Sequence, residues 1–322
     1  MGDIAGAVVE AESAGYIHKT FSSVDSILAL DSVPEPFGGR WQVGRYTDDT
    51  AMLLAVTGWL IDHEDHTEER LLNHLSQHYD PARRFGPGTA RIIETFRTQP
   101  AVWKSLANAF FEGGSYGNGS ATRVAPVGLY YHHNLPKLRS LAVRSSNPTH
   151  SHPLARQGCV LQAIAVALAI RLADRFSTTV YLELLQRELE AHGKSGEDIT
   201  LFQDKLKVMM QGLRRSAKPA ELVNELGNGI KVHESVPMAI YCFLNSLQNF
   251  DEAITNAIFL GGDTDTIACM TGAISGAFLG FDHLPGNWLE QIREEEFRLE
   301  RVKLRAERLF AASMAERDRQ VP

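Results

Sequence analysis

Apolar residues recur with the spacing of an α-helix along most of this chain, and this pattern limits the fold more than any other feature. Residues 51–61 are apolar with few β-branched side chains, and residues 160–173 are rich in Ala, Leu and Ile. Residues 237–247 begin with Pro, which suits the first turn of a helix, and residues 267–281 carry Gly at every fourth position. Each segment predicts a helix. We also expect a last helix over residues 288–314, with an apolar stripe of Ile292, Leu299, Val302, Ala306 and Leu309.

Signals for β-strands are weak by comparison. No pair of alternating apolar and polar runs flanks an Asn-Gly or Asp-Gly turn. The sequence contains neither an internal repeat nor a Pro/Ser/Gly-rich linker that would divide it. The 322 residues therefore predict an all-α fold, built as a single helical domain over residues 1–322. We expect functional loops within residues 31–45, 79–88, 113–120, 144–153 and 226–237.

Net charge and cysteine content argue against several classes of protein, namely nucleic-acid-binding, disulfide-bonded and zinc-binding ones. With 32 Lys and Arg against 39 Asp and Glu, the formal charge is −7, which argues against direct nucleic-acid binding. The cysteines are Cys159, Cys242 and Cys269; being few, distant and odd in number, they predict neither disulfides nor a zinc site. The apolar run at residues 163–170 is too short to span a membrane, and no secretory signal is visible. We expect a protein of a reducing compartment, the cytoplasm, with the nucleus as an alternative.

Two short acidic segments each come directly before an apolar helix. Each one alone is equally well explained by helix capping, because Asp and Thr satisfy the N–H groups at a helix start. If the two helices are neighbours, however, four carboxylates converge and repel one another unless a cation joins them. Oxygen ligands without paired Cys or His favour Mg²⁺, Mn²⁺ or Ca²⁺, and two such ions can orient a substrate and activate water. The segments are Tyr46-Thr47-Asp48-Asp49-Thr50 and Gly261-Gly262-Asp263-Thr264-Asp265-Thr266.

A glycine-rich run at residues 113–120 is the next candidate. Its backbone N–H groups could surround an anion, although an isolated run of this kind is more often a surface loop. Phe110 and Tyr116 could stack on an aromatic base, with core packing as the alternative for Phe110. Taken alone, Glu10 is explained as a carboxylate on the surface of a helix. The pair His150 and His152 is explained as two side chains that form hydrogen bonds in a loop.

Together, these segments resemble the ADP-ribosylglycohydrolase family over nearly the whole chain. The two acidic segments are specific to that family in combination. The runs Gly114-Ser115-Tyr116-Gly117-Asn118-Gly119, Gly227-Asn228-Gly229-Ile230 and Glu234-Ser235-Val236-Pro237 resemble its type-three branch, which removes ADP-ribose from serine and from O-acetyl-ADP-ribose. The resemblance implies an all-α orthogonal helical bundle of this type with a binuclear Mg²⁺ centre.

The resemblance also implies roles for individual residues. Glu10 matches a mobile acidic residue that approaches the ribose, and Glu10, Asp48 and Asp265 are the expected catalytic residues. The expected metal ligands are Thr47, Asp48, Asp49, Asp263, Asp265 and Thr266. Residues 115–119 match a loop that holds the diphosphate, and Phe110 and Tyr116 match contacts to adenine. The full set of expected substrate-binding residues is Phe110, Gly114, Ser115, Tyr116, Gly117, Asn118, Gly119, His150, Ile230 and Ser235.

The implied function is hydrolysis of O-linked ADP-ribose at C1″ with two Mg²⁺ ions, or Mn²⁺ in their place. The substrates would be serine-ADP-ribose, O-acetyl-ADP-ribose or poly-ADP-ribose, and the partner ADP-ribose or an ADP-ribosylated protein. We expect a monomer or weak homo-oligomer that does not bind membranes. Two alternatives stay open. Jellyfish J-type lens crystallins are similar to this branch, so the chain could be a structural protein of lens-cell cytoplasm. The second alternative is an ADP-ribose reader, which binds ADP-ribose without hydrolysing its linkage. Retention of every expected metal ligand favours the hydrolase.

Overall fold

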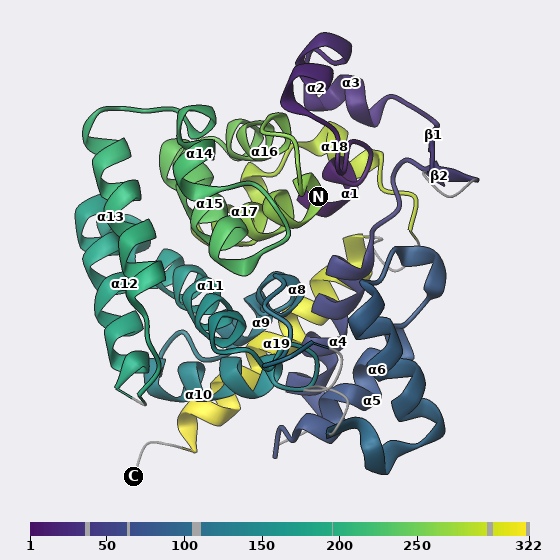
Figure 1. Ribbon diagram of the computed structural model, residues 1–322, viewed down its shortest axis with the longest axis vertical. Coiled ribbons are helices and arrows are strands. Elements are labelled where there is room, and N and C mark those ends of the chain that lie inside the picture. The colour runs from purple at the N-terminus through teal and green to yellow at the C-terminus, as the bar shows by residue number, and fades with distance from the viewer. Residues whose placement is uncertain (36–38, 63–64, 105–110, 195, 295–298, 320–322) are drawn as a thin grey trace.

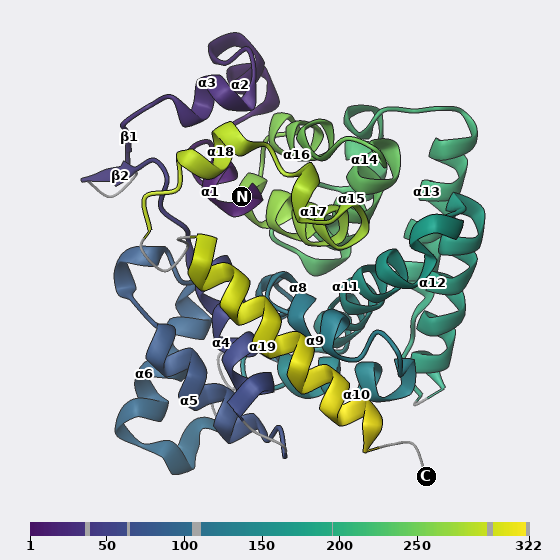
Figure 2. The same cartoon turned by 180° about the vertical axis from the view of Figure 1, so that it is seen from behind.

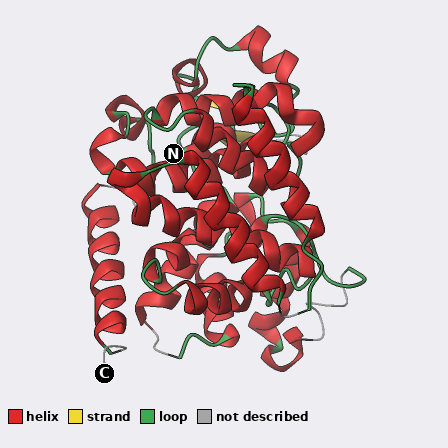
Figure 3. Cartoon of the chain, turned by 90° about the vertical axis from the view of Figure 1, so that its left-hand side faces the viewer, coloured by secondary structure: helices red, strands yellow, loops and turns green. Residues whose placement is uncertain are grey.

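The computed structural model describes residues 1–35, 39–62, 65–104, 111–194, 196–294 and 299–319. Over these residues the secondary structure is helices joined by loops, apart from one small two-stranded sheet (Figures 1 and 3). The α-helices are α1 (Gly2–Gly6), α2 (Ala14–Thr20), α3 (Val24–Leu28), α4 (Asp48–Asp62), α5 (Glu68–His78), α6 (Pro87–Thr98), α8 (Gly119–Thr122), α9 (Ala125–Tyr130), α10 (Leu135–Ser146), α11 (Pro153–Leu172), α12 (Thr178–Gly193), α13 (Thr200–Arg214), α14 (Val223–Leu226), α15 (Val232–Asn245), α16 (Phe250–Phe259), α17 (Thr264–Leu279), α18 (Gly286–Glu290) and α19 (Leu299–Asp318). Strands β1 (Ser32–Pro34) and β2 (Arg40–Gln42) pair antiparallel. The predicted all-α fold is confirmed.

Helices α11 and α17 form the centre of the molecule. Helix α11 packs against α9, α10, α12, α15 and α17, while α17 also contacts α1, α15 and α16. Pro153 takes the first position of α11, and the side chain of His152 accepts a hydrogen bond from the N–H of Leu154 at 3.1 Å. Among the described residues, Pro153–Arg175 alone is long and apolar enough to cross a membrane, but 78% of its most apolar window is buried inside the protein. Its apolar surface is therefore explained by its place in the core.

The remaining helices surround this centre on several sides. Helices α12 and α13 run side by side along one flank, and α4, α5 and α6 form the other (Figure 1). Seen from behind, the C-terminal helix α19 lies diagonally across α4 and α9 (Figure 2). The N-terminal helix α1 packs against α17. As a result, the first residues of the chain lie beside the start of α17, where the second acidic segment ends.

The prediction of one continuous helix over residues 288–314 was wrong. Helix α18 ends at Glu290, and residues 291–294 are not helical before α19 starts at Leu299. In this gap the N–H of Arg293 donates to the carbonyl oxygen of Gly44 at 3.1 Å, and Glu294 pairs with Arg83 at 3.0 Å. These contacts with distant segments compete with helix formation, so the apolar stripe is divided between two elements.

Three further details differ from the sequence predictions. Pro237 lies inside α15 rather than in its first turn, because α15 already starts at Val232. Gly280 has φ of 83° and ends α17 instead of belonging to a packed glycine face. The hairpin of β1 and β2 lies in residues 31–45, where we expected only a loop. Its paired residues Val33 and Trp41 supply a short ladder, and Trp41 is buried.

Candidate functional site

The first acidic segment is anchored by Asp3, a buried residue of α1. The Asp3 carboxylate accepts hydrogen bonds from the backbone N–H groups of Thr47 and Thr50, both at 3.1 Å. The hydroxyl groups of the same two threonines also donate to it. Asp3 therefore caps the start of α4 from another helix. The carboxylates of Asp48 and Asp49, which are not needed as caps, line the neighbouring cleft instead.

The second acidic segment enters α17 through two glycines. Gly261 and Gly262 have φ of 67° and 77°, and a Cβ at Gly262 would lie 2.4 Å from the carbonyl oxygen of Asn228. This close approach lets the N–H of Asp263 donate to that same oxygen at 2.9 Å. The hydroxyl of Thr264 points away from the cleft and donates to the carbonyl of Gly6 at 2.8 Å. The segment residues that line the cleft are Asp263, Asp265 and Thr266.

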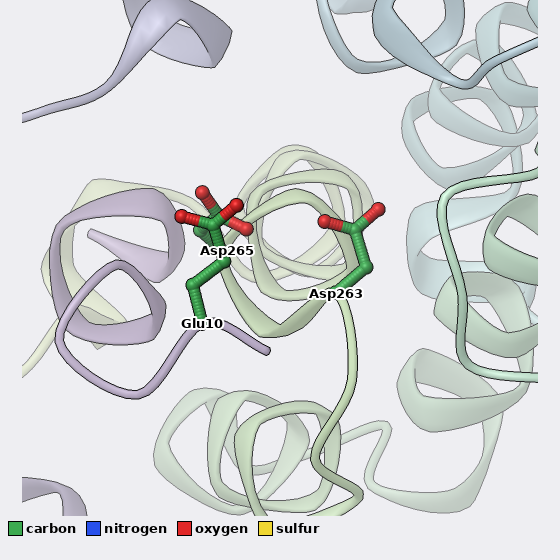
Figure 4. Close-up of side chains that lie close together, drawn as sticks. All are labelled: Glu10, Asp263 and Asp265. Carbon is green, nitrogen blue, oxygen red and sulfur yellow. The ribbon is translucent and has the colours of Figure 1, made fainter. Parts of the chain in front are cut away.

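Carboxylates from both acidic segments and from the N-terminal region meet in this cleft. Glu10, Asp263 and Asp265 each offer an oxygen atom within 4.8 Å of the others. Figure 4 shows Glu10 reaching from the N-terminal segment toward the two aspartates at the start of α17. Asp48 and Asp49 line the same cleft from the start of α4. The structure thus brings together two segments that lie more than 200 residues apart in the sequence.

The electrostatics of this cluster suit a cation. Burial raises the pKa of Asp48, Asp49 and Asp265 well above the usual value, and the negative charges of Asp3, Asp48 and Glu10, respectively, raise it further. Burial also raises the pKa of Asp263. Among the described residues, Oδ2 of Asp49 is buried and has no hydrogen-bond partner. A buried carboxylate oxygen without a donor is costly unless a cation satisfies it, so the residues fit a hard divalent cation.

The two threonines predicted as metal ligands lie in different settings. Thr266 lines the cleft, and its N–H donates to Oδ1 of Asp265 at 2.9 Å. Thr47 is fully buried beneath the cleft, where its hydroxyl donates to Asp3 at 2.9 Å. A hydroxyl oxygen that donates its proton to Asp3 still has lone pairs, which leaves it able to accept a cation.

The glycine-rich run forms one wall of the cleft through Ser115, Gly117, Asn118 and Gly119. Backbone hydrogen bonds join it to the segment before α15: the N–H of Asn118 donates to Ile230, and the N–H of Val232 donates to Tyr116, both at 3.1 Å. The side-chain amide of Asn118 donates to Oδ2 of Asp263 and, at 3.1 Å, to Oγ of Ser235. This wall is therefore fixed directly to the acidic cluster.

Of the other predicted substrate-binding residues, some line the cleft and others lie behind its wall. His150 lines it, and burial lowers the pKa of its imidazole to about 3, so the ring is neutral. Ile230 lies on the rim with 70% of its surface exposed. Ser235 is buried behind Asn118 and does not line the cleft.

Two members of the glycine-rich region, Gly114 and Tyr116, are also absent from the cleft wall. A Cβ at Gly114 would meet Oγ of Ser151 at 2.3 Å, so this glycine serves close packing. The half-exposed ring of Tyr116 lies 5.3 Å from that of His152, outside the cleft. Phe110 lies outside the described residues. Its neighbour Phe111 lines the cleft, which the sequence did not predict.

The sequence predictions missed Asp3 and Arg84. Asp3 stands in a run of small residues between Gly2 and Gly6, a sign of close helix packing around a buried acid. Arg84 lines the cleft and donates from Nη1 to Oε2 of Glu10 at 3.0 Å. Its signals in the sequence are a place beside Arg83 and within the loop expected at residues 79–88, two residues before Gly86, the N-cap of α6.

The chain is similar over most of its length to known proteins of one family. The sequence model of a family described as ADP-ribosylglycohydrolase matches residues 1–319. The chain is 35% identical over 313 residues to ADP-ribosylhydrolase ARH3 of Mus musculus, covering 89% of this chain and 83% of the relative. It is 34% identical over 318 residues to the human protein of the same name, covering 89% and 87%. A solved structure titled "ADP-ribosylglycohydrolase-related protein complex" has the same fold, with a TM-score of 0.71, 24% identity and coverage of 97% of this chain and 94% of that one.

Proposed function

The chain belongs to the ADP-ribosylglycohydrolase family and is a hydrolase, and from this premise we propose that it cleaves O-linked ADP-ribose at C1″ with two bound Mg²⁺ ions. Serine-ADP-ribose is the proposed main substrate, with O-acetyl-ADP-ribose and poly-ADP-ribose as further ones. The names of its relatives support an ADP-ribosylhydrolase activity. The resemblance of the glycine-rich run and of residues 227–237 to the type-three branch supports the O-linkage.

One observation carries the proposal: the oxygen atoms of Glu10, Asp263 and Asp265 approach within 4.8 Å of one another in an open cleft. Three carboxylates at that distance repel one another strongly, which lowers the stability of the fold. Such clusters are typical of functional sites, where a bound ligand compensates for the repulsion. The same cleft has a wall of glycines, which leaves room for a diphosphate beside the cluster.

The residues that would hold the cations are Thr47, Asp48, Asp49, Asp263, Asp265 and Thr266. When bound, two divalent cations polarise substrate oxygens and lower the pKa of a bound water. Asp48 and Asp49 approach from α4 and the other aspartates from α17, so the aspartates bind from two rigid helix ends. Mn²⁺ also prefers oxygen ligands and is the proposed substitute.

Glu10 is the proposed proton carrier. Hydrolysis adds the hydroxyl of water to C1″ and a proton to the departing serine oxygen, and a carboxyl beside the cluster can move that proton. Burial raises the pKa of Glu10, against the lowering effect of Arg84. A carboxyl with a raised pKa gives up and takes a proton more readily near neutral pH.

Hydrolysis of defined substrates tests this proposal. A serine-ADP-ribosylated peptide, an arginine-ADP-ribosylated peptide and O-acetyl-ADP-ribose are each incubated with the protein, in Mg²⁺ and in EDTA, and free ADP-ribose is quantified by mass spectrometry. We expect release from the two O-linked substrates in Mg²⁺ alone. Release from the arginine peptide only would contradict the O-linkage. Binding of ADP-ribose without release at high protein concentration would indicate a reader. No feature of the described residues favours the alternative role in an eye lens.

A further inference from the structure

Arg84 lies between two cavities that meet at Glu10. The first is the cleft that contains the acidic cluster. The second, of about 490 Å³, lies on the other side of Glu10, between the segment after α1, the strand β1 and the turn before α6. Glu10 and Arg84 belong to the walls of both cavities. The pair therefore stands at the boundary of the candidate active site.

The guanidinium group of Arg84 makes contacts that fix it in place. Nη1 donates to Oε2 of Glu10 at 3.0 Å and to the carbonyl oxygen of Ala7 at 2.8 Å. Nε donates to Oε1 of Glu35 at 3.2 Å, and the guanidinium carbon lies 4.3 Å from the ring centre of Trp41. A planar guanidinium can make all these contacts at once, whereas a lysine ammonium cannot. The contacts with Ala7, Glu35 and Trp41 thus fix the guanidinium group that binds Glu10.

The backbone at Arg84 is also unusual. Its φ is 61° and its ψ is 31°, a left-handed conformation that glycine adopts more easily than arginine. The contacts of the side chain offset this strain. An arginine in a left-handed backbone conformation, where glycine would be less strained, indicates that the contacts of its side chain are needed.

Glu10 needs a cation at this place for a physical reason. Its carboxylate lies within 4.8 Å of ligand oxygens of Asp263 and Asp265, so like charges push it away from the cluster. Among the described residues, Arg84 is the cation that forms an ion pair with Glu10. Without Arg84, the Glu10 side chain would turn toward solvent, since it is already one-third exposed (36%).

We propose that Arg84 is the positioning residue for Glu10: it holds the carboxylate against the acidic cluster, where the proton must be moved. This inference rests on the proposed function, because it assigns Arg84 to the proton step of that reaction. Its Nη1 and Nε atoms already donate to Glu10, Ala7 and Glu35, so we assign Arg84 to the position of Glu10 and not to binding of the ADP-ribose group. It therefore affects kcat and leaves KM nearly unchanged.

The test measures kcat and KM on the serine-ADP-ribosylated peptide for Arg84→Gly and Arg84→Lys, each in the natural and in the Glu10→Gln background. Arg84→Gly should fold, because glycine accepts the backbone angles without strain. We expect kcat to fall about 10- to 100-fold with KM within about 2-fold, since misplacing a reacting group by 1 Å costs about that much. Lys should restore part of the loss. In the Glu10→Gln background, Arg84→Gly should change kcat by less than about 2-fold. The matched control is Arg91→Ala, an exposed residue of α6, which should leave kcat unchanged.

The outcomes separate this inference from the proposed function. An inactive natural protein refutes the proposed function, and the inference with it. An active protein whose Arg84→Gly variant keeps full kcat refutes the inference alone. So does an equal loss of kcat in both backgrounds, which would indicate a general structural role. If Glu10→Gln has no measurable rate, crystal structures decide: in Arg84→Gly, the Glu10 carboxylate should leave the cluster, and an unmoved carboxylate refutes the inference.

Discussion

The carboxylate of Asp3 accepts a hydrogen bond from the backbone N–H of Thr47 at 3.1 Å, which joins the first helix of the chain to the start of α4. The same carboxylate binds the N–H of Thr50 at 3.1 Å. A charged cap of this kind is buried and comes from a distant segment. It therefore contributes both to the stability of α4 and to the position of Asp48 and Asp49, which follow and are proposed to bind the cations.

Replacing this cap should destabilise the protein. For Asp3→Ala we expect a loss of about 2 to 4 kcal/mol in the free energy of unfolding, because several buried donors lose a charged acceptor. Urea unfolding in EDTA measures the loss without interference from bound metal. The control Asp204→Ala removes an exposed carboxylate that pairs with Lys207 at 2.8 Å, and should cost less than about 0.5 kcal/mol. Equal effects of the two variants would contradict the capping role.

Gly6 should tolerate no side chain, because α1 and α17 touch there. A Cβ at Gly6 would lie 2.5 Å from the backbone N and Cα of Asp265, whereas a Cβ at Gly15 in α2 would meet no atom within 4 Å. Gly6→Ala should therefore cost about 1 to 3 kcal/mol and displace Asp265, lowering hydrolysis. Gly15→Ala should be neutral or stabilise by up to about 1 kcal/mol. Thermal unfolding and ADP-ribose release measure both. A Gly6→Ala protein with natural stability would show that the helices are not in close contact.

Some of these structural features could be predicted from the sequence, and others could not. The positions of α4, α11 and α17 followed from apolar periodicity, which depends only on local spacing. The capping of α4 by Asp3 could not be predicted, because the sequence offered Asp48 and Asp49 as nearer caps. The Arg84–Glu10 pair depends on loops that approach one another only in the folded chain. The break after α18 has the same origin, since Arg293 finds its partner at Gly44.

The contribution of Asp265 to the stability of the metal-free protein should fall as pH rises above 3.8, the usual pKa of an aspartate. Burial raises the pKa of Asp265 well above that value, so at this residue the folded state keeps a proton that the unfolded chain has already lost. The stabilising contribution is complete below the unfolded pKa and is lost as pH rises through the folded one. Comparing the melting temperature of the natural protein with that of Asp265→Asn in EDTA isolates this effect. The advantage of the Asn variant should grow with pH; a constant difference would contradict the account.

Mg²⁺ should reverse that trend in the natural protein. The cation displaces protons from the cluster, so the rise in melting temperature on adding Mg²⁺ should increase with pH. At a concentration of 100 times the dissociation constant of a site, each bound Mg²⁺ ion should stabilise the fold by about 2.7 kcal/mol. Calorimetry in a series of buffers measures this, together with the protons released. A stabilisation that does not vary with pH would mean that Mg²⁺ binds elsewhere.

Asp265→Asn should abolish both metal binding and turnover. The amide keeps the shape of the carboxylate but removes its charge, so kcat should fall by at least about 100-fold. In the same variant Mg²⁺ should no longer raise the melting temperature. In EDTA the variant should be at least as stable as the natural protein, because a repelling charge is gone. An unchanged rate would remove Asp265 from the proposed centre.

Anomalous diffraction from crystals grown with Mn²⁺ and ADP-ribose tests the central claim most directly, that the two acidic segments form one cation centre. The account predicts two anomalous peaks, each bound by oxygens from Asp48, Asp49, Asp263 or Asp265, with the ribose beside them. Peaks in another part of the molecule, or ADP-ribose bound in the cleft with no peak beside these aspartates, would contradict it.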